Sequence, residues 1–536
     1  MNPEILKTIR ERGLLLEKDI FDLLNSFDDS AIAKDFLEGL ERSSGQKIIT
    51  KAALTKNFEY VQNLVNRMHG ENKSLVEKTF VRLGLSLEIR KEKLVVPDAA
   101  PTNKHSFQVS CFDTSVGKKL EVSDFTGSFR SRYQQIQRIL MGRPELQQNL
   151  VSINKISNQR QNLAIIGIVS EKRVSKNKNL IIKFEDLTGE ITGVVMLNNT
   201  EAFKKAEELQ LDDIVGIKAS GDRDLLYVFD IFFPEAFVHN KVKFDADISV
   251  AFLSDLHAGS KMHLGEKLER FLTWLNSDDE NAKKIKYMFF VGDNVDGVGI
   301  FPGQEDSLSL RSTREQYELV ASYLRKVPKH ITMFMCPGQH DAVRVAEPQP
   351  AIDKNYAPSL HEIENLMLVT NPTTVTLIEN EKEFRVLMYH GASIHSFING
   401  IPELREIKAH RTPAKAVKHM LKRRHLAPTH SAVAYIPNAD KDPMVIGEVP
   451  DVLATGEVHR LDIENYNGVL VITGSCWQSQ TPFEEKVGNV PIPCKVPVLN
   501  LKTRELKIFD FEDKEEEKKE EEPVVGVVEA AVGGGK

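Results

Sequence analysis

The sequence predicts a multidomain α/β protein with a helical N-terminal domain, a small β-barrel and a large layered α/β domain. Three patterns support this prediction. Apolar residues recur at helical spacing over residues 1–92, strand-like runs follow one another between 160 and 235, and short apolar runs alternate with polar or helical segments from 245 to 510. The length of 536 residues also suits three or four domains, at roughly 100 to 200 residues each.

The composition is that of an ordinary globular chain. Hydrophobic residues make up 41% and charged residues 27% of the sequence, which excludes collagen-like, mucin-like and wholly disordered proteins. No apolar run approaches the roughly 18 residues of a membrane span, and the N-terminus has no apolar signal region, so we expect neither a membrane protein nor a Sec export substrate. Widely spaced cysteines without a CxxC pair argue against a disulfide framework and a structural zinc site, and they indicate a cytoplasmic protein. They are Cys111, Cys336, Cys476 and Cys494.

Negative charge is concentrated near the C-terminus. Residues 510–522 hold nine acids and three lysines, so this segment accounts for −6 of the net charge of −7. The rest of the chain is nearly neutral, and any contact with a polyanion must come from a local basic patch. Residues 509–536 are expected to form an acidic disordered tail.

Three segments precede the predicted barrel. Residues 1–92 are expected to form the helical domain, because their apolar residues follow a helical period. Residues 93–122 are expected to be a linker, since their first part, 93–105, contains two prolines and small residues and has no periodicity. Residues 123–158 are expected to form a helical connector, with apolar residues at helix spacing before Pro144.

The barrel is predicted over residues 159–240. Five strand-like runs occur there, and a helical stretch lies between the third and the fourth, which is the order of an OB-fold; a generic small sandwich is the alternative. Few aromatic residues lie on these strands beyond Phe184, Tyr227 and Phe229. The pattern therefore favours a barrel that docks proteins over one that binds single strands.

In the large domain, predicted over 245–508, polar residues follow each apolar run. Continuous apolar runs bounded by turns are typical of strands buried on both faces, and ligands of open α/β sheets bind at the carboxyl ends of such strands. Five loops follow these runs: Ser254–His257, Gly292–Asp296, Pro337–Asp341, His390–Gly391 and Gly456–His459. Their carboxylate, imidazole and amide groups, without thiolates, predict two divalent metal ions, Mn²⁺, Mg²⁺ or Fe²⁺ rather than a structural zinc.

Each of these pieces has an ordinary explanation when it stands alone. A single DxH is more often a solvated loop, a GD pair a turn, and a histidine beside an apolar strand a core residue. Five such pieces in order over about 200 residues, each at a strand end, favour the metal site over mere packing roles for His257 and His459.

The motifs DLH, GDNVD, GQHD, YHG and GEVH resemble the five motifs of calcineurin-like metallophosphoesterases. Together with the preceding barrel, DFTGSFRSRYQQIQRIL and MLKRRHLAP, they resemble more closely the small subunit of the archaeal D-family DNA polymerase, kin to the B-subunits of eukaryotic replicative polymerases. The resemblance covers roughly residues 120–505 and implies a calcineurin-like phosphoesterase fold for residues 245–508.

The resemblance also implies a role for each motif residue. The first metal ion would be held by Asp255, His257, Asp293 and His459. The second would be held by Asp293, Gln339, His390 and Glu457. His340 would stabilise charge or protonate the leaving 3′ oxygen, and Asp341 would orient its imidazole.

Two positions depart from the family pattern. Gln339 stands where the family usually has Asn, and Glu457 stands where GHxH has its first histidine. Gln keeps an amide oxygen on a longer stem, and Glu offers a hard oxygen in place of nitrogen. We therefore expect a working site with an altered metal preference rather than an inactive one.

The segment from 405 to 425 is rich in cations and nearly free of acids, and Pro413 can open a helix within it. Its cations would follow a phosphate backbone toward the metals or dock a partner, and the sequence leaves both alternatives open. The candidate DNA-binding residues are Arg405, Lys408, Arg411, Lys415, Lys418, Lys422, Arg423 and Arg424.

These features predict the proofreading 3′→5′ exonuclease subunit of a two-subunit archaeal replicative DNA polymerase, located in the cytoplasm at the nucleoid. The resemblance implies a large catalytic partner subunit and DNA with a 3′ end as substrate, and residues 1–92 are expected to bind replication partners. Two alternatives remain. One is a non-catalytic scaffold subunit with an impaired second metal site, and the other is a phosphatase, which the barrel and the basic segment disfavour.

Overall fold

The structure is a computed structural model that describes residues 105–112 and 119–512, together with scattered positions before residue 105. The chain divides into two units, Met1–Lys93 and Leu94–Lys536. In the first unit, β1 (Leu15–Leu16) pairs in parallel with β2 (Ile48–Ile49). The predicted helical domain otherwise lies outside the described residues, as does the acidic tail beyond residue 512. Within the described ranges, no helix is both long and apolar enough to cross a membrane.

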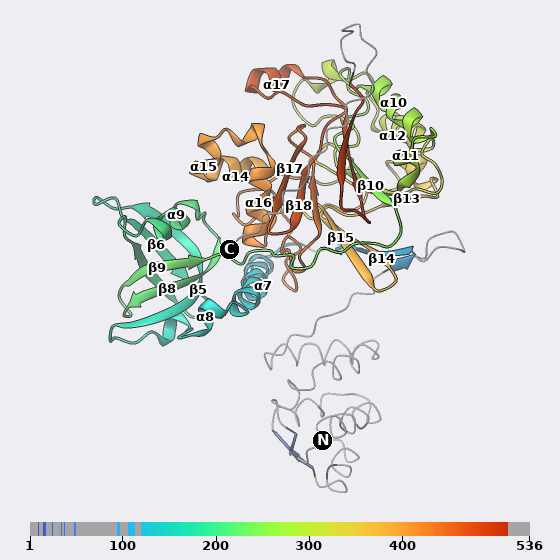
Figure 1. Cartoon of the computed structure of the whole chain (residues 1–536). Helices are drawn as coiled ribbons and strands as arrows, with labels where there is room; N and C mark the ends of the chain where they lie inside the picture. Colours follow the sequence, from blue (N-terminus) through green and yellow to red (C-terminus); the bar gives the residue numbers. More distant parts are fainter. Residues whose placement is uncertain are drawn as a thin grey trace. The chain divides into compact units, whose positions relative to one another are not determined.

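Two β-sheets form the large domain (Figure 1). The first has six strands in the order β13 (Leu366–Leu368), β12 (Thr332–Cys336), β11 (Ile285–Val291), β10 (Ser249–Leu253), β19 (Lys495–Asn500) and β20 (Leu506–Asp510). The second has seven strands in the order β17 (Asp462–Tyr466), β18 (Val469–Thr473), β16 (Val452–Thr455), β15 (Lys382–Met388), β14 (Thr373–Glu379), β4 (His105–Ser110) and β3 (Leu94–Val96). Strands β10 to β13 run parallel, as do β15, β16 and β18.

Helices and short helical turns accompany the sheets. They are α10 (Gly265–Leu275), α11 (Glu280–Lys284), η2 (Gln304–Ser307), α12 (Thr313–Leu324), α13 (Pro358–His361), α14 (Ile394–Gly400), α15 (Pro402–Glu406), η3 (Ala409–Arg411), α16 (Ala414–Arg423) and α17 (Pro482–Val487).

The two sheets pack face to face between outer layers of helices. Phe252 and Phe289 of the first sheet pack against Val375 and Phe384 of the second. The opposite side of the first sheet packs against α10 and α12, and that of the second against α14 and α16. The central strands are therefore buried on both faces, which explains their continuous apolar sequences and confirms the predicted mixed α/β fold.

The predicted linker over 93–122 is partly wrong, because it contains two strands of the large domain. Strand β4 pairs antiparallel with β14, and β3 pairs with β4. Phe107 and Val109 of β4 are buried between the sheets. Only two apolar side chains alternate there beside a proline-rich stretch, so the local pattern was too short to predict a strand. The large domain therefore begins before the barrel in sequence and resumes after it.

The domain also extends further toward the C-terminus than the predicted start of the tail at residue 509. Strand β20 ends at Asp510, and the rings of Phe509 and Phe511 lie 4.5 and 5.6 Å from the ring of Trp274. Lys495 forms ion pairs with Asp510 at 2.7 Å and Glu512 at 2.8 Å. The first acids of the charged run are thus neutralised within the folded domain.

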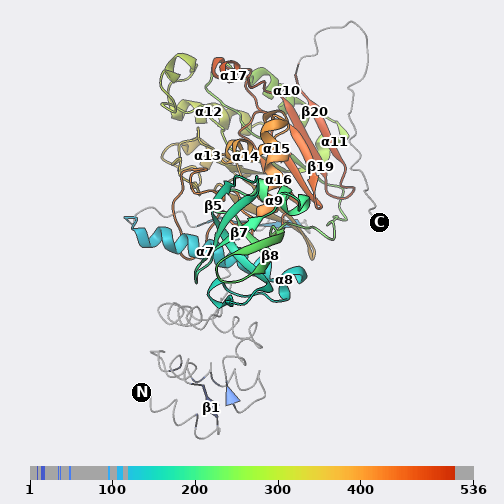
Figure 2. The same ribbon diagram turned by 90° about the vertical axis from the view of Figure 1, so that its left-hand side faces the viewer.

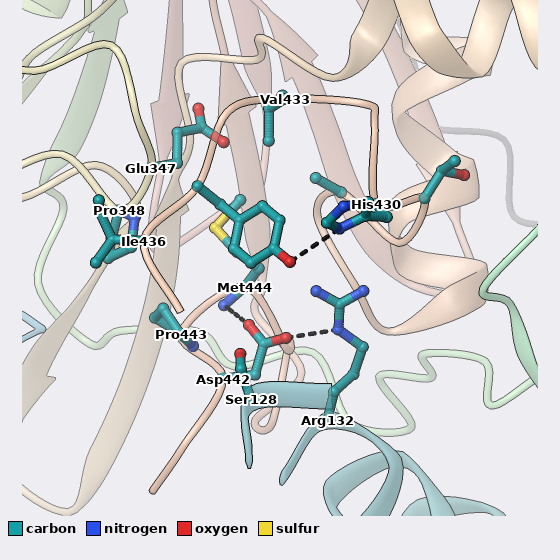
Figure 3. A pocket seen from close by; sticks show the side chains of 13 residues that line it. Ser128, Arg132, Glu347, Pro348, His430, Val433, Ile436, Asp442, Pro443 and Met444 are labelled. Atoms are coloured by element: carbon teal, nitrogen blue, oxygen red, sulfur yellow. Dashed lines mark hydrogen bonds and ion pairs between the residues drawn. The ribbon is translucent and has the colours of Figure 1, made fainter. Parts of the chain in front are cut away.

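Helix α7 (Val122–Met141) occupies the predicted helical connector, followed by α8 (Pro144–Gln147) and η1 (Ile153–Lys155). Tyr133, Ile136 and Leu140 of α7 pack against the barrel. Arg132 points the other way, and its Nε donates to the buried carboxylate of Asp442 at 2.6 Å (Figure 3). Helix α7 therefore fastens the barrel to the large domain.

Five strands close into a barrel in the order β5-β6-β7-β9-β8 (Figure 2). They are β5 (Gln161–Val174), β6 (Leu180–Glu185), β7 (Glu190–Val195), β8 (Ile214–Gly221) and β9 (Leu226–Phe232), with α9 (Thr200–Glu208) between β7 and β8. Alternate residues of β6, such as Ile182 and Phe184, point into the barrel core. The closed barrel rules out the open sandwich that the sequence had left as an alternative.

Candidate metal centre

Five of the predicted metal ligands follow their strands in the left-handed backbone conformation. Their φ angles are 52° at Asp255, 46° at His257, 47° at Asp293, 73° at Glu457 and 58° at His459. Such a conformation costs a non-glycine residue of the order of 1–3 kcal/mol and persists only where neighbouring contacts fix it. Here the loops hold one another, because the backbone N of Asp255 donates to the carbonyl of Gly292 and that of His257 to the carbonyl of Asp293, both at 3.0 Å.

The predicted ligands converge at the carboxyl ends of β10, β11, β12, β15 and β16. Three overlapping groups have ligand atoms within 4.8 Å of one another, namely Asp255–His257–His459, His257–Asp293–His340 and Asp255–Asp293–His390. Glu457 joins them, with its Oε2 at 3.3 Å from Nε2 of His390. The fold thus brings together side chains from five loops that span 205 positions of sequence, Asp255 to His459 inclusive.

Each histidine of the site is oriented through its Nδ1 atom. The Nδ1 atoms of His257 and His459 lie 3.1 and 2.9 Å from the carboxylates of Asp296 and Glu484. The other two contacts are those of His340 Nδ1 with the carbonyl of Asp296 at 2.8 Å and of His390 Nδ1 with the carbonyl of Val291 at 2.9 Å. In a neutral imidazole, an Nδ1–H that donates to such an acceptor leaves Nε2 unprotonated, which is the tautomer that binds a metal ion.

Two predicted ligand atoms, Asp255 Oδ2 and Gln339 Oε1, are buried without a hydrogen-bond partner among the described residues. The buried Nε2 of His390 lies 3.2 Å from Oδ2 of Asp293 and 3.3 Å from Oε2 of Glu457. A buried polar atom without a partner costs about 1–3 kcal/mol, so such atoms are uncommon in folded proteins. Hard oxygen and imidazole donors suit Mn²⁺, Mg²⁺ or Fe²⁺. The residues of this site therefore fit a metal centre.

Two of the predicted acidic ligands, Asp293 and Glu457, have pKa values that favour the ionised form. Burial alone would raise the pKa of Asp293, but His390, His340 and His257 outweigh it and hold that pKa well below its usual range. Burial is likewise outweighed at Glu457, where His390 and His395 lower the pKa. Metal ligands must be deprotonated, so both carboxylates are ready to bind a cation.

The two residues that depart from the family pattern contact each other. Gln339 Nε2 donates to Oε2 of Glu457 at 2.8 Å. The other amide atom, Oε1 of Gln339, is buried and has no hydrogen-bond partner in the described structure. The departures therefore form one unit, and both residues still offer an oxygen to a cation.

Comparison with known proteins identifies the family. Residues 250–461 match the family of DNA polymerase alpha/epsilon B-subunits. The DNA polymerase II small subunit of Methanothermobacter thermautotrophicus is 34% identical over 517 residues, a match that covers 95% of this chain and 100% of that protein. This chain belongs to the DNA polymerase II small subunit family. The resemblance to the archaeal D-family small subunit is thereby confirmed.

Other members of the polymerase small subunit family are longer. The small subunit of Pyrococcus furiosus is 36% identical over 402 residues, and this chain spans only 64% of its length. Among solved structures, an archaeal phosphodiesterase is 13% identical and has a TM-score of 0.25, with 49% of this chain and 99% of that chain covered.

The predicted role of Asp341 is wrong. Its Oδ1 accepts a hydrogen bond from the hydroxyl of Tyr317 at 2.9 Å, and its Oδ2 accepts from the backbone N atoms of Gly338 and Asn294 at 2.9 and 3.1 Å. The carbonyl of Asp296 orients His340 instead. Because these hydrogen bonds occupy both oxygens, Asp341 stabilises the loop and does not orient the imidazole of His340. Burial and the nearby Asp293 raise the pKa of Asp341 to about 6.

Sequence reasoning missed three contributors to the site. Asp296 belongs to the GDNVD motif. Its carboxylate contacts His257 and its carbonyl contacts His340, and the spacing of the motifs in the sequence does not predict either contact. Glu484 forms a capping box with Thr481 at the start of α17, a pattern visible in the sequence, whereas its contact with His459 is not. His395 lies 3.6 Å from Glu457 and had no motif around it.

The interpretation of the basic segment as a DNA-binding face is wrong at its end. Arg423 is buried, with its Nε 2.8 Å from Oδ1 of Asp213 on the barrel. Lys422 forms an ion pair with Glu208, and Arg424 Nε donates to the carbonyl of Ile446. Lys422 and Arg423 therefore hold the barrel against the large domain, whereas Arg424 is bound within the large domain, and none of the three has a free face for a phosphate.

The remaining cations of the segment differ in exposure. Lys418 is half-buried and lies 3.6 Å from Glu464. The other four are exposed: Arg405, Lys408, Arg411 and Lys415. Only these four stay candidates for contact with a polyanion.

Proposed function

We propose that this chain is the 3′→5′ exonuclease subunit of a two-subunit DNA polymerase and that it removes nucleotides from a DNA 3′ end by two-metal hydrolysis. One observation supports the proposal above all. Asp255 Oδ2 and Gln339 Oε1 are buried without hydrogen-bond partners in the described structure, and both belong to this one group of predicted ligands. In a scaffold that binds no metal ion, nothing would offset the free-energy cost of burying these polar atoms without partners.

The first metal ion would be held by Asp255, His257, Asp293 and His459, and the second by Asp293, Gln339, His390 and Glu457, with Asp293 shared. Two divalent ions, when bound, polarise a phosphodiester and lower the pKa of a water molecule between them. The donor set favours Mn²⁺ or Mg²⁺, with Fe²⁺ also suitable.

His340 is the candidate to protonate the leaving 3′ oxygen. Its Nδ1–H donates to the carbonyl of Asp296, so Nε2 is the atom that exchanges the proton. Burial alone would lower the pKa of His340, but Asp293 and Asp296 raise it.

We further propose that the barrel is an OB-fold whose role is protein docking. The closed order β5-β6-β7-β9-β8 with α9 between the third and fourth strands is that of an OB-fold. We infer a large catalytic subunit as the partner, because the family consists of small subunits of a DNA polymerase.

A strand-shortening assay tests the function. Purified protein with Mn²⁺ or Mg²⁺ should shorten a 5′-labelled single strand from its 3′ end, one nucleotide at a time. Asp293→Ala should abolish shortening and the binding of both ions, because Asp293 is the shared ligand, while association with a large subunit should survive. Shortening by Asp293→Ala at a rate near that of the unchanged protein would refute the site assignment.

A non-catalytic scaffold is the second candidate. The hydrogen bond between Gln339 and Glu457 supports it, because an amide engaged by a carboxylate could also be a step toward loss of the second metal ion. Absence of shortening in every metal would favour the scaffold.

A further inference from the structure

One exposed segment beside the metal centre has no part in the proposed hydrolysis. Residues 297–303 (GVGIFPG), here called the apolar loop, follow Asp296 directly and contain no charged side chain. Val298, Ile300 and Phe301 are exposed to 40%, 40% and 43%. Apolar side chains of this size gain free energy on burial, so their exposure beside a candidate active site suggests a ligand.

Two buried glutamines hold the base of the apolar loop. Gln304 Nε2 donates to the carbonyl of Asp296 at 2.8 Å, and its Oε1 accepts from the backbone N of Ile300 at 2.9 Å. Gln316 Oε1 accepts from the backbone N of Gly297 at 2.9 Å, and its Nε2 donates to the Gly297 carbonyl at 3.1 Å. The loop is therefore fixed at its base while its apolar side chains face solvent.

The apolar loop begins in contact with the proposed proton donor. Gly297 has a φ of 74°, and a Cβ there would lie 2.4 Å from the carbonyl oxygen of His340 and 2.8 Å from Cγ1 of Ile300. Only glycine permits this approach. Ile300 consequently lies close to the backbone of His340, and the apolar loop begins directly beside the proposed metal centre.

The composition of the apolar loop suits the bases of a nucleic acid better than its phosphate groups. It offers no cation to a phosphate, and the exposed acids Glu305 and Asp306 that follow it would repel one. The uncharged face of a base, in contrast, stacks favourably on aromatic and apolar side chains.

We propose that the apolar loop binds the unpaired base at the 3′ end of the substrate, with Phe301 and Ile300 as the stacking surface. This assignment rests on the proposed function, because a base reaches the loop only when its phosphodiester lies in the metal centre. A paired terminal base would first have to unpair and unstack before it could turn onto the loop, which costs a few kcal/mol, so the loop selects single-stranded or frayed 3′ ends.

The test uses the full chain with Mn²⁺ and oligonucleotides whose 3′-terminal phosphodiester is replaced by a non-hydrolysable phosphonate linkage, so that the strand can occupy the metal centre and is not cut. In Phe301→Trp, a single-stranded oligonucleotide should quench the fluorescence of the new indole by stacking, and an oligonucleotide with an abasic 3′-terminal nucleotide should not. The unchanged protein supplies the background of Trp274 and Trp477. Phe237→Trp is the matched control, because Phe237 is 47% exposed and lies outside the loop, and its fluorescence should not depend on the base.

A binding measurement completes the test. Phe301→Ala should bind the oligonucleotide roughly 5-fold or more weakly than the unchanged protein, since stacking of one base is worth at least that factor. The abasic oligonucleotide should not discriminate between the two proteins.

Two outcomes would overturn the proposal. One is equal affinity of both proteins together with an unquenched Phe301→Trp. The other is a Phe301→Ala protein that keeps its oligonucleotide affinity and retains a large subunit more weakly, which would make the loop a protein contact. Neither measurement requires hydrolysis, so a failure of the strand-shortening assay would refute the proposed function and still leave base binding measurable.

Discussion

At the scale of single residues, the carboxylate of Glu484, which is not among the predicted metal ligands, has two structural roles. Glu484 Oε2 accepts from the backbone N and the hydroxyl of Thr481 at 2.9 and 3.0 Å, which caps α17. Its Oε1 lies 2.9 Å from Nδ1 of His459. Burial alone would raise the pKa of Glu484, but His459 and the capping contacts lower it, so the group orients His459 as an ion.

Replacement of this carboxylate should weaken metal binding. In Glu484→Gln the shape is kept and the charge is lost, and we expect the affinity for Mn²⁺ to fall roughly 10- to 100-fold, the usual effect of losing a partner of a metal-bound histidine. Isothermal titration with Mn²⁺ measures it. The neighbouring Glu485 is exposed, and Glu485→Gln should bind the ion as the unchanged protein does. Equal affinities in all three proteins would show that His459 is not a ligand.

The Gln339–Glu457 pair should respond as a unit. Each single change, Gln339→Asn or Glu457→His, breaks their hydrogen bond, so each should impair activity more than the double variant does. If the pair tunes a working site, the double variant should stay active and shift its preference from Mg²⁺ toward Mn²⁺ or softer ions. Metal-titrated exonuclease assays decide this. The scaffold hypothesis would be supported instead if the unchanged chain were inactive with every metal ion and the double variant gained activity.

His425 should make stability depend on pH. Its Nδ1 accepts from the backbone N of Ala427 at 3.0 Å and its Nε2 donates to Asp442 at 3.2 Å, so a second proton has no acceptor. Burial and the nearby Arg132 lower its pKa to about 4, whereas the unfolded value is about 6.5. The unfolded chain therefore binds more protons between these values, and the contribution of His425, roughly 3 kcal/mol, is fully present above pH about 6.5 and is lost toward pH about 4.

Thermal unfolding from pH 7.5 to 4.5 checks this contribution. The variant His425→Gln should be less stable than the unchanged chain at pH 7.5, and the difference in melting temperature should shrink as the pH falls. A difference that stays constant over this range would contradict the assignment.

At the scale of elements, α16 shows where sequence reasoning stops. Pro413 and the run of cations predicted a basic helix, and Pro413 indeed caps α16. The partner of Arg423 is Asp213, which lies 210 positions away in sequence, and no local pattern indicates such a pair. Composition alone therefore could not separate the cations that hold the barrel from those that face solvent.

The exposed cations of this segment give a sharper test of nucleic-acid binding. Combined replacement of Lys408, Arg411 and Lys415 by Ala should flatten the dependence of single-strand affinity on salt by about 0.7 for each phosphate that is no longer neutralised, or about 2 in total. Fluorescence anisotropy between low and moderate salt measures the slope. Three exposed lysines on other elements, Lys176, Lys329 and Lys354, supply the control triple. Equal slopes for the two triple variants would remove this segment from the DNA path.

At the scale of the whole second unit, the predictable features are those with a local cause. Buried parallel strands need long apolar runs, and their polar ends meet at one edge, so the ligand loops could be predicted from five short motifs. Strand β4 could not, because its pairing with β14 joins His105–Ser110 to residues more than 260 positions away. Likewise, the contact of Glu484 with His459 and the anchoring of the apolar loop by Gln304 depend on tertiary packing.

The attachment of the barrel to the large domain should depend on the buried pair of Arg423 and Asp213. Burial raises the pKa of Asp213 even beside Arg423, so Arg423→Met would leave a costly carboxylate without its partner. We expect a loss of roughly 3–5 kcal/mol of stability. The double variant Arg423→Met with Asp213→Asn should recover much of it, because it removes both charges and keeps the oxygen that accepts from the backbone N of Gln210.

Thermal unfolding and limited proteolysis with mass mapping measure this effect. Arg423→Met should melt earlier and be cut faster in the segments between the barrel and the large domain. Lys415→Met, on the exposed face of the same helix, should behave as the unchanged chain, since surface replacements change stability by about 0.5 kcal/mol or less. If Arg423→Met were as stable and as resistant as Lys415→Met, the ion pair would be no part of what fastens the barrel, and the packing of α7 through Tyr133 and Ile136 would have to suffice.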